Sequence, residues 1–129
     1  MNALIVDDSK AMRGILRKIV RGLGFSTLEA GNGQEGLDQL HAHDDISLML
    51  VDWNMPVMNG LELVRTVRSD KRFEPLRIVM VTTETEPARM VRALMSGVDE
   101  FVMKPFTRDI LVEKLRLIGV KIPDQATAS

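Results

Sequence analysis

The chain has 129 residues, a length that fits one domain with a hydrophobic core of its own. It contains no cysteine, which excludes disulfides and cysteine-ligated zinc and favours a reducing compartment. The 17 basic and 18 acidic residues nearly cancel, so no overall charge favours nucleic acid or an anionic membrane. The first apolar run meets Asp7 and Asp8 after four residues, unlike a signal peptide or a membrane span. We therefore expect a cytoplasmic protein that binds neither nucleic acid nor membrane.

Five short apolar runs alternate with stretches in which apolar residues recur at helical spacing. The runs, which predict strands, are residues 3–6, 25–29, 48–51, 78–81 and 101–103. Helices are predicted to start near residues 10, 33, 61, 87 and 108. Unbroken apolar runs are typical of strands buried on both faces of a parallel sheet. The alternation therefore predicts an α/β fold in which five helices cover a five-stranded parallel sheet on both faces. The run at 25–29 has mixed polarity, so we expect it near an edge of the sheet.

Local features predict how the helices begin and which faces they bury. Ser9 is a good N-cap, and Asn32 with Glu35 three residues later resembles a capping box. Helical spacing places Ile15 on the buried face of the first helix. It also places four residues of the fourth helix inward, Met90, Val91, Leu94 and Met95. Most of the nine methionines are accordingly interpreted as core residues.

Other features are interpreted as solvent-facing. His41 and His43 are two residues apart, which is not the spacing of a helical metal-binding pair, so we expect both to be solvated. The basic residues of the first helix are predicted to form a solvated face: Arg13, Arg17, Lys18 and Arg21. Beyond Gly119 the chain is small and polar, so we predict a domain over residues 1–120 and a flexible C-terminal tail over 121–129.

Polar residues follow four of the predicted strands at the point where each strand ends. They are Asp7 and Asp8, Asp52, Thr82, and Lys104. The carboxyl ends of parallel strands meet at one edge, which is where ligands bind in open α/β sheets. Three carboxylates placed so close repel one another and need a cation or protons. Mg²⁺ is suited to such a site, because it takes one or two carboxylates together with waters and a phosphoryl oxygen. A single polar residue after a strand is usually a turn residue. Four runs that each end on a residue suited to phosphoryl chemistry favour a functional site.

The residues at these strand ends resemble the receiver domain of two-component response regulators. The motifs that carry the resemblance are Asp7-Asp8-Ser9, Asp52-Trp53-Asn54-Met55-Pro56 with Asn59-Gly60, Thr82, and Lys104-Pro105-Phe106. The run D-W-N-M-P-V-M-N-G-L-E-L is especially similar to single-domain chemotaxis regulators. The resemblance covers about residues 2–118 and implies a doubly wound, flavodoxin-like sheet with strand order 2-1-3-4-5.

The resemblance also implies a reaction. Asp52 would accept a phosphoryl group from a phosphohistidine on a sensor histidine kinase, since a carboxylate is a competent nucleophile towards phosphorus. The implied Mg²⁺ ligands are Asp8, Asp52 and the backbone carbonyl of Asn54, with Asp7 helping through water. Lys104 and the Thr82 hydroxyl would supply the positioning and charge neutralisation on which phosphoryl transfer depends.

The family further implies a switch. Thr82 would move towards the phosphoryl group and Phe101 would turn inward, although Phe101 also fits as the first core residue of its strand. Relatives usually carry Tyr there, whereas Phe101 has no hydroxyl for a partner to bind. Asn54 and Glu84 would flank the phosphoryl group and tune its lifetime, here towards rapid loss. We expect a monomer whose output leaves by protein contact through the fourth helix, fifth strand and fifth helix, with a flagellar motor as one candidate partner.

Three alternatives remain open. A Mg²⁺-dependent aspartyl phosphatase would use Asp52, but those of the haloacid dehalogenase type place a second Asp two residues later, where this chain has Asn54. A flavin carrier of the same topology would need a hydroxyl- and glycine-rich loop in place of Asp7 and Asp8, which repel phosphate. A receiver outside chemotaxis would relay or sequester phosphate.

Overall fold

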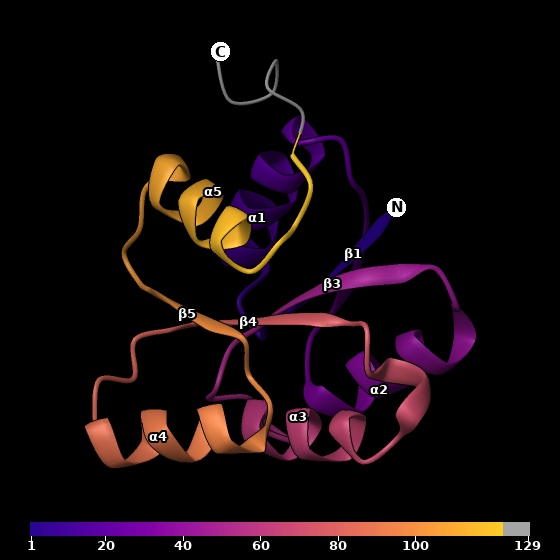
Figure 1. Ribbon diagram of the computed structural model, residues 1–129, viewed down its shortest axis with the longest axis vertical. Coiled ribbons are helices and arrows are strands. Elements are labelled where there is room, and N and C mark those ends of the chain that lie inside the picture. Colours follow the sequence, from indigo (N-terminus) through magenta and orange to yellow (C-terminus); the bar gives the residue numbers. More distant parts are fainter. Residues whose placement is uncertain (123–129) are drawn as a thin grey trace.

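The computed structural model, which describes residues 1–122, has a central parallel sheet with helices on both faces (Figure 1). The five strands lie in the order β2-β1-β3-β4-β5, as predicted. The strands are β1 (Asn2–Val6), β2 (Ser26–Ala30), β3 (Ile46–Val51), β4 (Arg77–Thr82) and β5 (Glu100–Met103). The helices are α1 (Lys10–Gly22), α2 (Gly33–Ala42), α3 (Gly60–Arg68), α4 (Pro87–Ser96) and α5 (Arg108–Leu117), with a short 3₁₀ helix η1 (Lys71–Phe73). Helices α1 and α5 cover one face, and α2, α3 and α4 cover the other.

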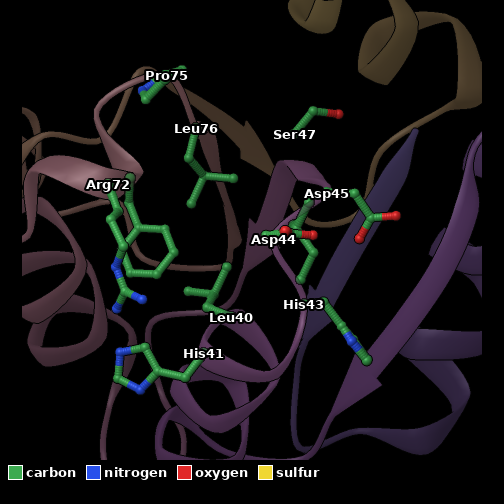
Figure 2. Close-up of a pocket in the computed structure, with 11 residues that line it drawn as sticks. Leu40, His41, His43, Asp44, Asp45, Ser47, Arg72, Pro75 and Leu76 are labelled. Atoms are coloured by element: carbon green, nitrogen blue, oxygen red, sulfur yellow. The ribbon is translucent and has the colours of Figure 1, made fainter.

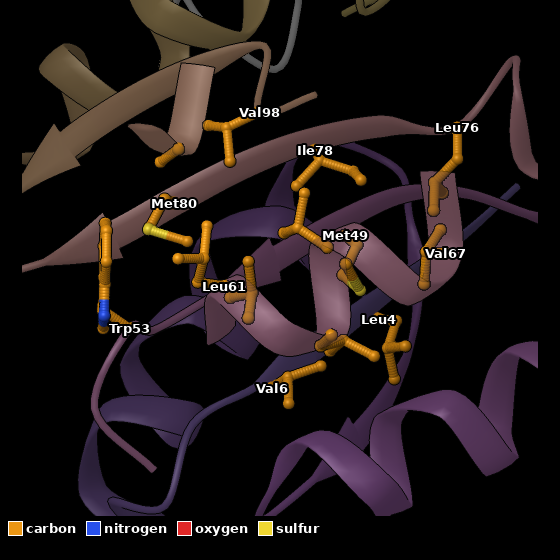
Figure 3. Close-up of a cluster of buried hydrophobic side chains, with 14 of the residues drawn as sticks. Leu4, Val6, Met49, Trp53, Leu61, Val67, Leu76, Ile78, Met80 and Val98 are labelled. Atoms are coloured by element: carbon orange, nitrogen blue, oxygen red, sulfur yellow. The ribbon is translucent and has the colours of Figure 1, made fainter. Parts of the chain in front are cut away.

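Strands β1, β3, β4 and β5 are buried on both faces because each contributes side chains to two hydrophobic clusters, one on either side of the sheet. In β1, Leu4 and Val6 face the cluster under α2–α4, whereas Ala3 and Ile5 face the cluster under α1 and α5. All four side chains are fully buried. Figure 3 shows the first cluster, in which Met49, Ile78 and Met80 of the sheet lie against Leu61 and Val67 of α3. β2 is an edge strand, as its mixed polarity predicted.

Helix starts follow the predicted caps, with one change. The Ser9 hydroxyl accepts a hydrogen bond from the Met12 N–H at 3.2 Å. The Asn32 side chain accepts one from the Glu35 N–H, but the Glu35 carboxylate bonds the Asn32 side-chain amide instead of its backbone. A complete reciprocal capping box forms at the start of α3, between Asn59 and Glu62, where we had not predicted one.

The prediction for the inner face of α4 is correct for Met90, which packs partly buried against the cluster under α2–α4, and wrong for the other three residues. Val91, Leu94 and Met95 are exposed by 53%, 50% and 83%, and Ala93 is the buried residue of this helix. Ile15 of α1 is also half exposed. Helical spacing identifies an apolar stripe but not how much of it faces the sheet, and here the stripe is wider than the contact. An apolar surface on α4 is left open to solvent.

Arg68, at the end of α3, joins three segments at the amino edge of β4. Its guanidinium donates to the carbonyls of Phe73 (2.8 Å), Leu76 (2.8 Å) and Gly97 (3.0 Å) and to the Asp99 carboxylate (3.0 Å). The same Asp99 oxygen accepts the Ile78 N–H at 2.8 Å. One cation therefore satisfies the polar groups of the η1–β4 connection and of the α4–β5 loop.

At the C-terminal end, Ile122 packs against the cluster under α1 and α5. Residues 123–129, which make up most of the predicted tail, lie outside the described residues. Within residues 1–122, no helix has the length and apolar character needed to cross a membrane.

Replacing Arg68 by Ala should lower the free energy of unfolding by about 2 to 3 kcal/mol, because several part-buried acceptors lose a charged donor. Urea denaturation followed by circular dichroism measures this change. Arg72→Ala is the matched control, since Arg72 forms an exposed pair with Asp70 and lies over the Phe73 ring, and it should cost clearly less than Arg68→Ala. Equal losses in the two variants would contradict the role given to Arg68.

Candidate functional site at the carboxyl edge of the sheet

The predicted site residues meet because the backbone ladders continue one residue beyond the strands. The Asp7 N–H donates to Ala30 O at 3.1 Å, and the Asp52 N–H donates to Val6 O at 3.0 Å. The Lys104 N–H donates to Thr82 O, also at 3.0 Å. Each hydrogen bond aligns the end of one strand with its neighbour, so the side chains that follow the strands share one edge of the sheet.

Three carboxylates form an acidic cluster at this edge. Asp7, Asp8 and Asp52 each offer an oxygen, and these oxygens all lie within 4.8 Å of one another. Their exposure differs, because the Asp7 side chain is buried, Asp52 is 12% exposed and Asp8 faces solvent. The cluster is therefore open on the Asp8 side.

Lys104 neutralises part of this charge. Its ammonium lies 2.8 Å from Asp7 Oδ2 and 3.1 Å from Asp52 Oδ2, and the side chain is only 14% exposed. Burial opposes the charged form, but the hydrogen bonds and negative charges of Asp7 and Asp52 outweigh it and raise the pKa of Lys104. The lysine is fully protonated at neutral pH.

Backbone donors hold the other carboxylate oxygens. The Ser9 N–H donates to Asp7 Oδ1 at 2.9 Å, and the Trp53 N–H donates to Asp52 Oδ1 at 2.7 Å. Each carboxylate oxygen has two lone pairs, so one stays available on each. A set of hard oxygen donors with an open side fits Mg²⁺, which keeps several of its waters when it binds a protein.

The remaining predicted residues have different surroundings. Thr82 is fully buried, and its hydroxyl accepts the Glu84 N–H at 3.2 Å. Phe101 is buried in the cluster under α2–α4, in accord with its interpretation as a core residue. Asn54 is exposed in the loop that follows Asp52. The Glu84 carboxylate lies 3.6 Å from Arg89 of α4.

The loop between Asp52 and α3 is shaped by two backbone constraints. The Met58 N–H donates to Pro56 O at 2.7 Å across Val57, whose φ of 69° completes a tight turn. At Gly60, a Cβ would collide with the Asp52 carbonyl, which accounts for the glycine in the motif.

Sequence reasoning missed one residue beside the cluster. Arg13, which we assigned to a solvated face, is only 19% exposed, and its Nη1 donates to the backbone carbonyl of Asp7 at 2.7 Å. Its position one helical turn after Ser9 brings it under the β1–α1 loop, whereas helical spacing alone assigns it to a polar face.

A pocket of about 450 Å³ lies at the opposite edge of the sheet, before β3 and β4 (Figure 2). It is lined by the end of α2 and by η1, and it contains none of the predicted site residues. The expectation of solvated histidines is confirmed for His41, which is exposed. It is wrong for His43, because its Nε2 is buried and has no hydrogen-bond partner within residues 1–122. His41 stacks on Phe73, with ring centroids 6.0 Å apart.

Comparisons with known proteins identify a family and several relatives of this chain. The family described as "Response regulator receiver domain" matches residues 3–116. Chemotaxis protein CheY1 of Helicobacter pylori is 45% identical over 92% of this chain and 96% of its own length. The CheY homolog of Campylobacter jejuni is 47% identical over 89% of each chain. The CheX-CheY-BeF3-Mg complex of Borrelia burgdorferi contains a fold that matches with a TM-score of 0.85 at 27% identity, covering 94% of this chain and 90% of that one.

The α/β fold and the acidic carboxyl edge define a class of phosphoacceptor switch domains, and the chain belongs to the response regulator receiver domain family. Within that family it is CheY-like, since CheY proteins match it over most of its length at 42–47% identity.

Replacing Lys104 by Met should lower the free energy of unfolding at neutral pH without Mg²⁺, because the carboxylates lose their counter-charge. Folding raises the pKa of Lys104 above its ordinary value of 10.5, so its contribution is complete below that pH and is lost as the pH rises through the folded value. Urea titrations across this range should therefore show the two proteins converging. Lys114→Met removes a more exposed lysine and serves as the control. A difference that stays constant with pH would contradict this account.

Proposed function

We propose that the chain is a phosphorylation-controlled switch in which Asp52 accepts a phosphoryl group from a phosphohistidine of a sensor histidine kinase. The observation that carries the proposal is the position of the Asp52 carboxylate, partly exposed and 3.1 Å from the Lys104 ammonium. Asp7 is too buried to reach a donor, and Asp8 forms no ion pair with Lys104, whose two partners within residues 1–122 are Asp7 and Asp52. Asp52 alone of the three combines access with a neighbouring cation.

The acidic cluster supports Mg²⁺ as the cofactor. Asp8, Asp52 and the Asn54 carbonyl would hold the ion, with Asp7 helping through water. When bound, Mg²⁺ supplies positive charge to the phosphoryl oxygens, which lowers the barrier to transfer. Asp7 is held by Ser9 and Lys104 and so keeps its place without the ion.

In the transfer step, the Asp52 oxygen forms a bond to phosphorus while the phosphorus–nitrogen bond of the donor breaks. The electron pair of that bond returns to the imidazole of the kinase. Lys104 stays protonated and neutralises charge on the transferred group, so it needs to exchange no proton. Hydrolysis by water later returns Asp52 to its free carboxylate.

The switch would begin at Thr82. A phosphoryl group presents strong acceptor oxygens, and the Thr82 hydroxyl can turn to donate to one of them. Its present contact with the Glu84 N–H links it to the segment before α4. The Phe101 side chain is buried in the structure, and it would fill the space that Thr82 leaves when it moves towards the phosphoryl group. The exposed apolar residues of α4 support an output face formed by α4, β5 and α5.

Chemotaxis is the pathway that the named relatives support. We propose a cytoplasmic monomer whose output partner is a protein, with a flagellar motor component as one candidate. Co-purification with and without beryllofluoride would distinguish this role from a phosphate relay or sink. The aspartyl phosphatase alternative is not favoured, because Asn54 cannot act as its second acid.

Asp52→Asn should abolish phosphorylation by acetyl phosphate in the presence of Mg²⁺, because an amide is not a nucleophile towards phosphorus at this site. Intact-mass spectrometry measures the added phosphoryl group. Asp44→Asn, in the exposed loop before β3, is the matched control and should label normally. Labelling of Asp7 or Asp8 in the Asp52 variant would refute the assignment.

The phosphorylated protein should lose its phosphoryl group quickly once the donor is removed, because Asn54 and Glu84, which would flank the group where water attacks, resemble the pair found in fast-cycling members of the family. Phosphate-affinity electrophoresis over time measures the decay. Chelation of Mg²⁺ is the control and should slow the loss. A half-life of many hours in Mg²⁺ would contradict this prediction.

A further inference from the structure

Arg13 connects the acidic cluster to the edge strand of the sheet. Its Nη1 donates to Asp7 O at 2.7 Å, and its Nε lies 3.2 Å from Glu29 Oε1 at the end of β2. Gly31 lies beside the same guanidinium, since a Cβ placed there would be 3.7 Å from Nη1. The part-buried Arg13 side chain therefore links the β1–α1 loop to the end of β2, with Gly31 of the β2–α2 loop beside it.

The carbonyl that Arg13 binds belongs to the peptide between Asp7 and Asp8. Because a peptide unit is planar, fixing this carbonyl fixes the direction in which the chain enters Asp8. The Asp7 side chain has its own partners, Ser9 and Lys104. By contrast, the structure records no hydrogen bond or ion pair for the Asp8 side chain within residues 1–122. Its orientation depends on the backbone that Arg13 holds.

Glu29 holds Arg13 in turn. Its two oxygens lie 3.2 Å from Arg13 and 2.7 Å from Arg17. Partial burial disfavours the charged form, but the hydrogen bonds and charges of Arg17 and Arg13 outweigh it and lower the pKa of Glu29. The carboxylate is ionised at neutral pH and keeps the guanidinium in place.

We propose that Arg13, held by Glu29, is a positioning residue for the metal site, which preorients Asp8 towards Mg²⁺ through the Asp7 carbonyl. This inference rests on the proposed function, since it concerns the same cation. Partners that orient metal ligands commonly change metal affinity by about tenfold or more when they are removed.

The direction in which Mg²⁺ affinity changes when Arg13 is replaced distinguishes a positioning role from a purely electrostatic one. Arg13 is a cation close to a cation site, so electrostatics alone predict that its loss tightens Mg²⁺ binding. Positioning predicts the opposite, because Asp8 loses its fixed direction. Arg13→Lys keeps the charge but cannot contact Asp7 O and Glu29 in the same forked geometry. It should therefore also weaken binding.

The experiment is a titration of the full chain with magnesium chloride, in which binding is measured by calorimetry and by the fluorescence of Trp53. We expect the dissociation constant to rise about fivefold to tenfold in Arg13→Gln, and by a smaller factor in Arg13→Lys and Glu29→Gln. Arg17→Gln is the matched control, because Arg17 contacts the same Glu29 but not Asp7. Its constant should stay within about twofold of the wild type.

The possible outcomes are distinct. Unchanged or tighter binding in folded Arg13→Gln or Arg13→Lys overturns the inference while the proposed function stands. Equal weakening in Arg17→Gln also overturns it, because the effect would then not require the contact with Asp7 O. If the wild type binds no Mg²⁺ by calorimetry, the proposed function fails and this inference fails with it. If Arg13→Gln does not fold, Arg13→Lys and Glu29→Gln decide the question.

Discussion

The contact of the Lys104 ammonium with two carboxylates is the interaction on which the site depends. It joins Lys104 to Asp7, 97 positions earlier in the sequence, and to Asp52, 52 positions earlier, at the carboxyl edge of the sheet. Without a cation, three carboxylates within 4.8 Å of one another would repel and disperse. The lysine makes the cluster tolerable in the absence of metal while leaving Asp8 open to solvent. The site is thus preassembled on its buried side and adaptable on its exposed side.

The fold divides stability and function between the two edges of the sheet. Strands buried on both faces place their ends rigidly, so the residues that follow them need little help to converge. At the amino edge, Arg68 fixes the segments around β4 by satisfying their carbonyls. At the carboxyl edge, the charged side chains of Lys104 and the three carboxylates lie close together. Conformational change is expected there, where a new charge can alter the balance between competing hydrogen bonds.

A physical path leads from the acidic cluster to the open surface of α4. Lys104 and Thr82 are linked by their backbones, and the Thr82 hydroxyl contacts the segment that precedes α4. Arg89, on the first turn of that helix, pairs with Glu84. The apolar side chains of α4 that face solvent are compatible with the proposed output face, since exposed apolar patches often mark protein interaction sites.

The sequence by itself determined the α/β class, the strands, the edge position of β2 and the polar residues at the carboxyl edge, because buried parallel strands and helices have different hydrophobic periods. The strand order came from family resemblance. Only the tertiary structure decided that Val91, Leu94 and Met95 face outward and that Arg13 turns under the acidic loop. Periodicity describes one element at a time, whereas the width of a buried face and the partner of a long cationic side chain depend on what a distant segment places beside them.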